Sequence, residues 1–182
     1  MFVCACLVAC SCGRPAVILT RQAPPTLGGE PGGYERAVVE RVIDGDTVEV
    51  RITGRVPGEG LGRARIGGTY DVRLVGIDTP ESVAPGEPVE CFGPEASEAA
   101  EALLEGREVF LVVDVEEEDS FGRLLRYVYM GAEMANARLV VNGYAHAYRY
   151  PPNVRHSALF GALQRHARSH DAGLWAAAGC AS

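Results

Sequence analysis

Apolar and polar residues alternate over several short stretches of the chain, and a repeat of two predicts β-strands. The clearest stretch is YDVRLVGIDTPES at 70–82, which ends because Pro80 has no N–H to donate to a neighbouring strand. Residues 37–53 contain two more such runs, bent around Asp-Gly-Asp, and the segments 108–115 and 123–130 complete the set. The pattern therefore predicts five strands.

Three segments have the features of helices. The first, 93–106, carries Pro94 in its first turn and acidic residues near its start, and Gly106 ends it. The second covers 132–142 and ends at a glycine, and the third covers 153–170. Five strands mixed with three helices, without an internal repeat, predict an α+β domain: a small antiparallel barrel with helices packed on its outside.

The two ends of the chain differ from this domain. Residues 1–20 are apolar and rich in cysteine, but too short to span a membrane, and we interpret them as an export signal. The sequence LVAC is similar to the processing box of a bacterial lipoprotein, in which its last residue, Cys10, is lipidated. We therefore expect an extracytoplasmic protein, secreted or lipid-anchored. The composition predicts a flexible linker at 21–33, a folded domain at 34–176 and a C-terminal tail at 177–182.

The cysteines of the first segment allow a second interpretation, which is metal binding by Cys4, Cys6, Cys10 and Cys12. Their spacing is not that of a common zinc site, and no histidine lies nearby in the sequence. We favour export over metal binding for this segment.

The bulk composition limits the classes of partner. The chain has 182 residues, 47% of them hydrophobic, which suits one globular domain with a sizeable core. Its formal net charge of −7 argues weakly against a protein that wraps duplex nucleic acid. A small phosphodiester site depends on a few local cations and a bound metal, so the average charge leaves such a site open.

Carboxylates gather at the two bends of the predicted barrel. Asp44 and Asp46 flank Gly45, and residues two apart on an extended chain point to the same side. Two carboxylates so close repel each other unless a cation lies between them, and hard oxygen ligands suit Ca²⁺ or Mg²⁺. The alternative is an ordinary hairpin turn, for which Asp-Gly is a common signal.

The stretch at 70–82 supplies further oxygen ligands. Asp78 carries a third carboxylate, and the carbonyl of Thr79 is a fourth hard donor. Glu81 follows the rigid Pro80, and a carboxylate held there is suited to orient or deprotonate a water molecule. The alternative for Glu81 is a solvent-exposed loop glutamate.

Two arginines complete this group. Arg73 lies inside the predicted strand, and Arg123 follows Phe-Gly; a guanidinium binds phosphate through two parallel hydrogen bonds. Either arginine is equally suited to pair with the acidic run at 116–119. Strand alternation places Arg73 and Asp78 on opposite faces, so a shared site requires a bend, which we expect at Gly76. Together these residues are suited to phosphodiester hydrolysis.

The motifs that carry this chemistry resemble those of the staphylococcal nuclease family. The segments VIDGDTVEV, RLVGIDTPE, FGPEAS, DSFGRLLRYVY and YRYPPN occur in the family's order between Val38 and Trp175. The resemblance implies a five-stranded OB-fold Greek-key β-barrel with three packed α-helices. It also implies a Ca²⁺-dependent, sequence-nonspecific nuclease that hydrolyses DNA and/or RNA and leaves 3′-phosphates.

The resemblance assigns a role to each residue that matches a family motif. It implies Ca²⁺ binding by Asp46, Asp78 and the Thr79 carbonyl, with Asp44 close by. It implies catalysis by Glu81 as general base or water-orienting group and by Arg73 and Arg123 as phosphate ligands, and nucleotide contacts by Tyr148 and Tyr150. An aromatic side chain beside a base stacks on it without sequence preference, although two tyrosines are also suited to pack the barrel rim.

The chain departs from the family pattern at two cationic positions. Ser120 and Pro151 stand where the reference nuclease carries lysines. Fewer cations at the mouth of the site weaken the binding of long polyanions without removing the chemistry. A non-catalytic nucleic-acid- or protein-binding module of the same family is the alternative function, but the complete arginine–glutamate set favours the enzyme. We expect a monomer.

The resemblance also suggests a disulfide between Cys91 and Cys180. In the family fold the C-terminal tail passes near the first helix, which Cys91 precedes. The alternative is two unrelated free thiols, because a sequence gives no distance. An exported protein would keep such a bond oxidised.

Overall fold

The computed structural model describes residues 32–82 and 90–176. The predicted export signal with Cys10, nearly all of the predicted linker and the tail with Cys180 lie outside the described residues. Among the residues described, no helix is long and apolar enough to cross a membrane.

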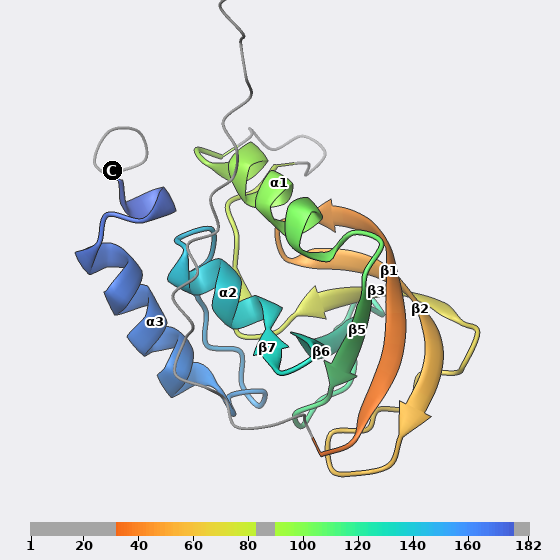
Figure 1. Cartoon of the computed structure of the whole chain (residues 1–182). Helices are drawn as coiled ribbons and strands as arrows, with labels where there is room; N and C mark the ends of the chain where they lie inside the picture. Colours follow the sequence, from red (N-terminus) through yellow and green to blue (C-terminus); the bar gives the residue numbers. More distant parts are fainter. Residues whose placement is uncertain (1–31, 83–89, 177–182) are drawn as a thin grey trace, which may run out of the picture.

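Five strands form a closed barrel: β1 (Tyr34–Asp44), β2 (Thr47–Val56), β3 (Thr69–Leu74), β5 (Glu108–Val112) and β6 (Leu124–Met130). They pair antiparallel in the order β3-β2-β1-β5-β6, and a parallel pairing of β3 with β6 closes the sheet on itself. This is the predicted OB-fold Greek-key barrel. Figure 1 shows it beside the three helices.

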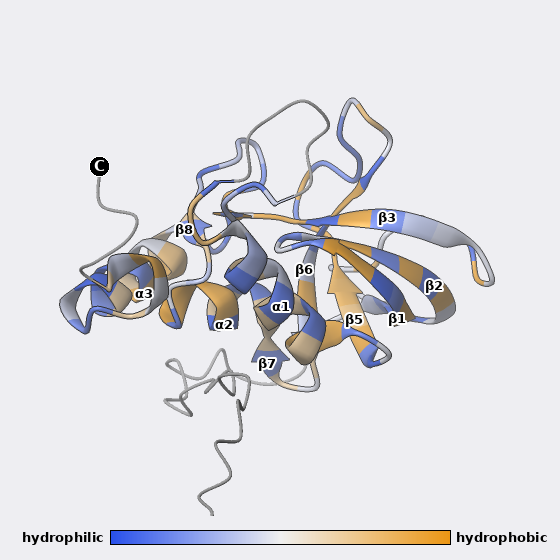
Figure 2. Ribbon diagram, turned by 90° about the horizontal axis from the view of Figure 1, so that it is seen from above, coloured by the Kyte–Doolittle hydropathy of each residue, from blue (hydrophilic) through white to orange (hydrophobic). Residues whose placement is uncertain are grey.

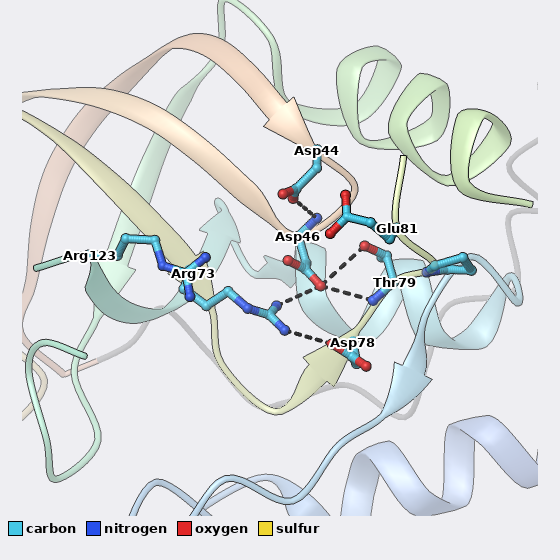
Figure 3. Close-up of a pocket in the computed structure, with 8 residues that line it drawn as sticks. Asp44, Asp46, Arg73, Asp78, Thr79, Glu81 and Arg123 are labelled. Atoms are coloured by element: carbon cyan, nitrogen blue, oxygen red, sulfur yellow. Dashed lines mark hydrogen bonds and ion pairs between the residues drawn. The ribbon is translucent and has the colours of Figure 1, made fainter. Parts of the chain in front are cut away.

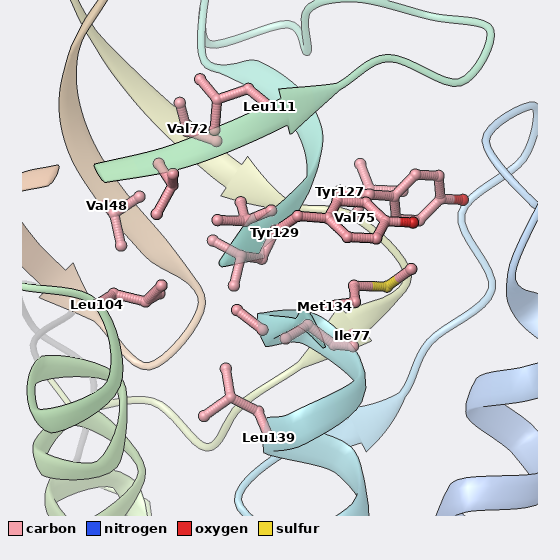
Figure 4. Packing of buried hydrophobic residues seen from close by; sticks show 14 of the residues in the cluster. Val48, Val72, Val75, Ile77, Leu104, Leu111, Tyr127, Tyr129, Met134 and Leu139 are labelled. Carbon is pink, nitrogen blue, oxygen red and sulfur yellow. The ribbon is translucent and has the colours of Figure 1, made fainter. Parts of the chain in front are cut away.

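The alternating sequence fills the barrel. In β2, the side chains of Val48, Val50 and Ile52 are buried, while Glu49 and Arg51 between them are more exposed. Side chains from β2, β3 and β5 meet those of the helices in one continuous core, as Figure 4 shows. Burial of these aliphatic groups provides the main stabilisation of the barrel.

Three helices cover one end of the barrel: α1 (Gly93–Leu104), α2 (Ala135–Val141) and α3 (Ser157–Ser169). α2 packs between β6 and α3 and is buried on nearly all sides, which explains its predominantly apolar colouring in Figure 2. Its buried Asn136 accepts a hydrogen bond from the Val128 N–H and donates one to the Val75 carbonyl, both at 2.9 Å. α2 thereby holds the turn that follows β3, where the candidate site begins.

The third predicted strand is interrupted. After Leu74 the chain turns at Gly76, whose φ of +84° favours glycine, and resumes as β4 (Ile77–Asp78). A Cβ on Gly76 would lie 2.4 Å from a ring atom of Phe160, so a side chain does not fit there. β4 pairs with β8 (His146–Ala147), a strand that the sequence analysis missed. The expected bend at Gly76 is confirmed.

Three predicted boundaries are wrong. The strand predicted at 108–115 ends at Val112, because the next N–H, of Val113, donates to the Gly60 carbonyl at 3.0 Å, and the side-chain oxygen of Asn153 accepts the N–H groups of Val115 and Glu116. The same role keeps Asn153 out of α3, which begins at Ser157. The helix predicted from residue 132 begins at Ala135, because Glu133–Met134 forms the short strand β7 on β6.

Candidate functional site

A pocket of about 220 Å³ opens where β1, β2, β3 and β4 meet. It is lined by seven of the predicted residues together with Pro80, and Figure 3 shows them: Asp44, Asp46, Arg73, Asp78, Thr79, Glu81 and Arg123. The structure therefore brings together all the predicted metal-binding and catalytic residues. Tyr148 and Tyr150 do not line this pocket.

The turn between β1 and β2 places the first two carboxylates. The Asp46 N–H donates to Asp44 Oδ1 at 3.0 Å, so Asp44 caps the hairpin turn as well as lining the pocket. The turn interpretation of this segment is confirmed, and both aspartates also line the pocket, while cation binding by them stays a prediction. Gly45 is required because a Cβ there would lie 2.7 Å from the Thr79 hydroxyl.

Asp46 is the most constrained carboxylate of the pocket. Only 6% of the residue is exposed, and its Oδ2 accepts the N–H and the hydroxyl of Thr79 at 2.8 and 3.1 Å. Arg73 Nη1 lies 2.7 Å from the same oxygen. Burial raises the pKa of Asp46 to about 6, Arg73 opposes this rise, and the charges of Asp44 and Asp78 add to it. The site therefore holds negative charge that Arg73 does not fully compensate.

Arg73 bridges the two main carboxylates. Its Nη2 lies 2.9 Å from Asp78 Oδ1 while its Nη1 contacts Asp46, as the dashed lines in Figure 3 mark. The Gly76 turn makes this possible, because it returns Asp78 to the face of the sheet on which Arg73 lies. Asp78 is the more exposed partner, with 54% of its side chain accessible.

The oxygen donors fit a hard cation in chemistry but do not form a site from side chains alone. Within 32–82 and 90–176, no group of three or more His, Cys, Asp or Glu side chains is arranged to hold a metal ion. Two carboxylates leave most of the six to eight ligands of Ca²⁺ to carbonyl groups, water or a bound phosphate. The predicted set of Asp46, Asp78 and the Thr79 carbonyl is consistent with this count.

Arg123 lies at the rim of the pocket. Its Nε donates to Asp119 Oδ2 at 2.8 Å, and Asp119 Oδ1 accepts the N–H groups of Phe121 and Arg123. Burial pushes the pKa of Asp119 upward, but these hydrogen bonds from Arg123 and Phe121 outweigh it and lower the pKa. Arg123 thus both lines the pocket and pairs with the acidic run at 116–119. The predicted alternative, an ion pair between Arg123 and the acidic run, is confirmed at Asp119.

Glu81 is held at both its backbone and its side chain. The Glu81 N–H donates to Glu90 Oε2 at 3.0 Å, and the Glu90 N–H donates back to the Glu81 carbonyl at 2.8 Å. Glu81 Oε1 accepts the Ser82 N–H at 2.9 Å, and the Ser82 hydroxyl lies 2.7 Å from that of Ser97 in α1. Glu90 and Ser97 therefore position the predicted base; Ser97 belongs to the motif FGPEAS, whereas no local sequence pattern marks Glu90.

The two predicted nucleotide-binding tyrosines lie beside the pocket rather than in it. Their ring centroids are 6.4 Å apart, and half of Tyr148 is exposed. Tyr148 lines a neighbouring hollow with Gly76 and Ala147.

Cys91 takes part in a disulfide, and every other cysteine of the chain lies outside the described residues, so its pairing with Cys180 stays a prediction.

Comparisons with known proteins agree with this geometry. The family model described as "Staphylococcal nuclease homologue" matches residues 71–177. The chain is 37% identical to a Thermonuclease of Staphylococcus intermedius over 141 residues, covering 78% of this chain and 76% of that protein. It is 36% identical to the Thermonuclease of Staphylococcus hyicus over 158 residues, covering 86% of each. It is 30% identical to the Endonuclease YncB of Bacillus subtilis over 143 residues, covering 78% of this chain and 62% of that protein. With this fold, this pocket and these relatives, the chain belongs to the staphylococcal nuclease family.

Proposed function

We propose that the protein is a Ca²⁺-dependent, sequence-nonspecific nuclease that hydrolyses phosphodiester bonds of DNA and/or RNA and leaves 3′-phosphates. One observation carries this proposal: Arg73, Glu81 and Asp78 of the stretch 70–82 line one pocket with Asp46 and Arg123, which come from two other segments. This pocket combines groups that bind a phosphate, hold a cation and direct a water molecule. The names of the relatives, thermonuclease and endonuclease, support the same reaction class.

In this proposal Asp46, Asp78 and the Thr79 carbonyl hold the cation, with Asp44 beside them. When bound, Ca²⁺ neutralises charge on the phosphate oxygens and so favours attack at phosphorus. The raised pKa of Asp46 supports this assignment, because burial and the neighbouring charges of Asp44 and Asp78 outweigh the opposing effect of Arg73, and a bound cation would offset them.

The two arginines bind the phosphate that is cleaved. Arg73 has its two terminal nitrogens on Asp46 and Asp78, so it faces the position that the cation and the phosphate share. Arg123 lines the opposite rim and uses its Nε for Asp119, which leaves the terminal nitrogens for a phosphate oxygen. Both guanidinium groups stabilise the additional negative charge that develops on the phosphate oxygens during the reaction.

Glu81 directs the water. It accepts a proton from the water as the new P–O bond forms, and the 5′ oxygen leaves with a proton taken from solvent, so that the phosphate remains on the 3′ side. The bonds from Glu90 and Ser82 keep Glu81 at the pocket wall. A fixed base has a smaller entropic cost to reach the reactive geometry than a loop glutamate without such contacts.

The alternative is a binding module that has the fold without the reaction. The complete set of pocket residues favours the enzyme. Export to an oxidising compartment, with or without a lipid on Cys10, is part of the proposal, and so is a monomeric state. The disulfide at Cys91 is consistent with such a compartment.

Ca²⁺ removal tests the reaction. We expect the purified protein to cleave single- and double-stranded DNA and RNA in Ca²⁺, to lose cleavage in excess chelator and to regain it when Ca²⁺ is restored. Mg²⁺ should support much less cleavage, because it requires near-octahedral geometry and loses water reluctantly. Full activity in chelator would rule out the metal, and binding without cleavage in Ca²⁺ would favour the alternative.

Peptide mapping of the mature protein without reductant tests the compartment. We expect a peptide in which Cys91 is linked to Cys180. Free Cys180 in protein recovered from outside the cytoplasm would contradict this pairing, and recovery of the protein only from the cytoplasm would contradict export.

A further inference from the structure

One long segment of this acidic chain contains no acidic residue. Residues 134–170 contain five arginines and all four histidines of the chain, but no aspartate or glutamate. A local basic segment in a protein of net charge −7 is a feature of a surface that binds an anion. The segment includes β8, α3 and the loop that joins them.

This segment borders a second hollow of about 340 Å³, which we call the α3 groove. Gly76, Ala147, Tyr148 and Arg149 line one side, and α3 lines the other through residues that include Phe160, Gly161 and Gln164. Gln164 fixes the two sides relative to each other, because its side-chain oxygen accepts the Ala147 N–H at 2.7 Å.

Two of the five arginines are available at this groove. Arg138 pairs with Glu133, Arg155 with Asp114 at 3.4 Å, and Arg168 stacks on Trp175 at 4.2 Å. Arg149 lines the groove, and Arg165 Nη1 would lie 3.6 Å from a Cβ on Gly161, at the groove wall. Across the described ranges, neither Arg149 nor Arg165 has a carboxylate partner, and both are exposed.

Two glycines keep the groove open. Gly76 is required by the turn before β4, as described above. Gly161 lies inside α3, where glycine costs about 1 kcal/mol relative to alanine. Packing does not demand it, because within 4 Å its added Cβ would meet only the end of the Arg165 side chain. The absence of a side chain at 161 therefore keeps the groove open and contributes little to the packing of the core.

The α3 groove continues the candidate active site. The short β4–β8 ladder is a common wall: Asp78 lines the pocket, while Ala147 of the same ladder lines the groove. The Tyr148 N–H donates to the Gly76 carbonyl at 3.0 Å, which extends this wall by one more pair. Figure 2 shows β8 between α3 and the barrel. A strand cleaved in the pocket can thus pass directly into the groove.

We propose that the α3 groove binds the part of the nucleic-acid strand next to the cleaved bond, with Arg149 and Arg165 on its phosphates, beyond the nucleotide contact that the resemblance implies for Tyr148. This rests on the proposed function and deepens it. The two arginines supply positive charge for a long substrate in a chain that lacks lysine at 120 and 151. Such contacts are sequence-independent, because phosphates carry no base identity.

The test measures binding of a labelled single-stranded DNA of roughly 12 nucleotides, within the usual site size, by fluorescence anisotropy at several salt concentrations. It uses the full chain with Glu81→Gln, in Ca²⁺, so that the strand stays intact. The Arg149→Gln/Arg165→Gln variant should bind about tenfold more weakly at 0.1 M salt, and its log–log salt slope should be smaller by about 1.4, which is two phosphates at about 0.7 each. The matched control is Arg36→Gln/Arg107→Gln, which removes the same charge from exposed positions outside residues 134–170.

A third variant, Gly161→Leu, fills the groove without changing charge. It should fold, since a side chain there meets no backbone, and it should weaken binding with the salt slope unchanged. Affinity and slope equal to the control in the double-arginine variant would overturn the inference, as would full affinity in Gly161→Leu. If the parent chain neither binds nor, with Glu81 restored, cleaves the strand, the proposed function itself fails.

Discussion

The barrel carries two arginine–carboxylate clusters, one in its core and one in its pocket. In the core, Arg126 and Glu35 are both fully buried, and Arg126 Nε lies 2.9 Å from Glu35 Oε2. In the pocket, Arg73 contacts Asp46 and Asp78 at 2.7 and 2.9 Å, but Asp78 is largely exposed. The ion-pair distances are nearly the same, so distance does not distinguish the two clusters.

Hydrogen-bond satisfaction does distinguish them. Arg126 Nη1 donates to the carbonyls of Glu117 and Leu125, and Glu35 Oε1 accepts the Ala64 N–H at 2.8 Å. The core cluster thus joins β1 and β6 to the loops at 57–68 and 113–123, and its polar groups are satisfied. A buried pair of this kind is strongly destabilised when one partner is removed, because the other charge remains buried without compensation.

The pocket cluster has more negative than positive charge. Four carboxylates line the pocket with two arginines, and burial together with two neighbouring charges raises the pKa of Asp46. An arrangement that leaves charge uncompensated costs stability and is retained where it binds or reacts with something. The comparison indicates that the core cluster serves the fold and the pocket cluster serves the reaction. Four substitutions test this division, in order of decreasing effect.

The largest effect is expected for Glu35→Gln. It should lower the free energy of unfolding by about 3–5 kcal/mol, because it leaves the Arg126 guanidinium buried without its carboxylate. Urea denaturation followed by circular dichroism measures this change. The matched control is Glu40→Gln, which breaks the partly exposed 2.7 Å pair with Arg51 and should cost less than about 1 kcal/mol. Similar losses in both variants would contradict a special role for the core cluster.

The next largest effect concerns activity. Glu81→Gln and Arg123→Ala should each lower kcat by at least about a hundredfold, the usual scale for a general base or a charge-stabilising donor. Glu81 lies at the pocket surface, so the free energy of unfolding of Glu81→Gln should change little, whereas Arg123→Ala also removes the 2.8 Å ion pair with Asp119 and should lower it. Initial rates on a fluorescent oligonucleotide measure kcat, with the exposed Glu95→Gln of α1 as the control. A wild-type rate in either pocket variant would refute its assigned role.

The smallest effect is expected for the stability of Asp46→Asn in chelator. The raised pKa of Asp46 means that the folded chain binds more protons than the unfolded chain between pH 3.8 and about 6. Its ionisation therefore lowers stability as the pH rises through this window. The variant lacks that charge and keeps the pair between Arg73 and Asp78. Its free energy of unfolding at pH 8 should therefore be higher than that of the wild type or within about 1 kcal/mol of it.

Urea unfolding of Asp46→Asn at pH 4 and pH 8 measures this difference. The variant should gain stability relative to the wild type at the higher pH, while its cleavage of nucleic acid is lost. A loss of stability as large as that of Glu35→Gln would place Asp46 in the same structural class as the core cluster and remove the distinction.

Much of the fold follows from local sequence. The alternation in β2 and β3, Pro94 and Gly106 around α1, and the bend at Gly76 each act through the backbone of a few neighbouring residues. The errors occur where a group distant in the sequence decides a boundary. The Gly60 carbonyl and the Asn153 side chain bind the backbone beyond β5, and pairing with β6 makes Glu133–Met134 a strand instead of a helix. Neither effect leaves a periodic signal in the sequence.

The sequence by itself determined the chemical identity of the pocket: three aspartates, a glutamate and two arginines in motifs of one family. Only the tertiary structure decided which charged groups of the chain pair with one another. Closure of the barrel pairs Glu35 with Arg126 across 91 positions, and the Gly76 turn places Asp78 against Arg73. The α3 groove likewise exists only because β8 and α3 face each other across two glycines. Backbone periodicity is a property of neighbours along the chain, whereas burial and ion pairing depend on which surfaces the closed barrel excludes from water.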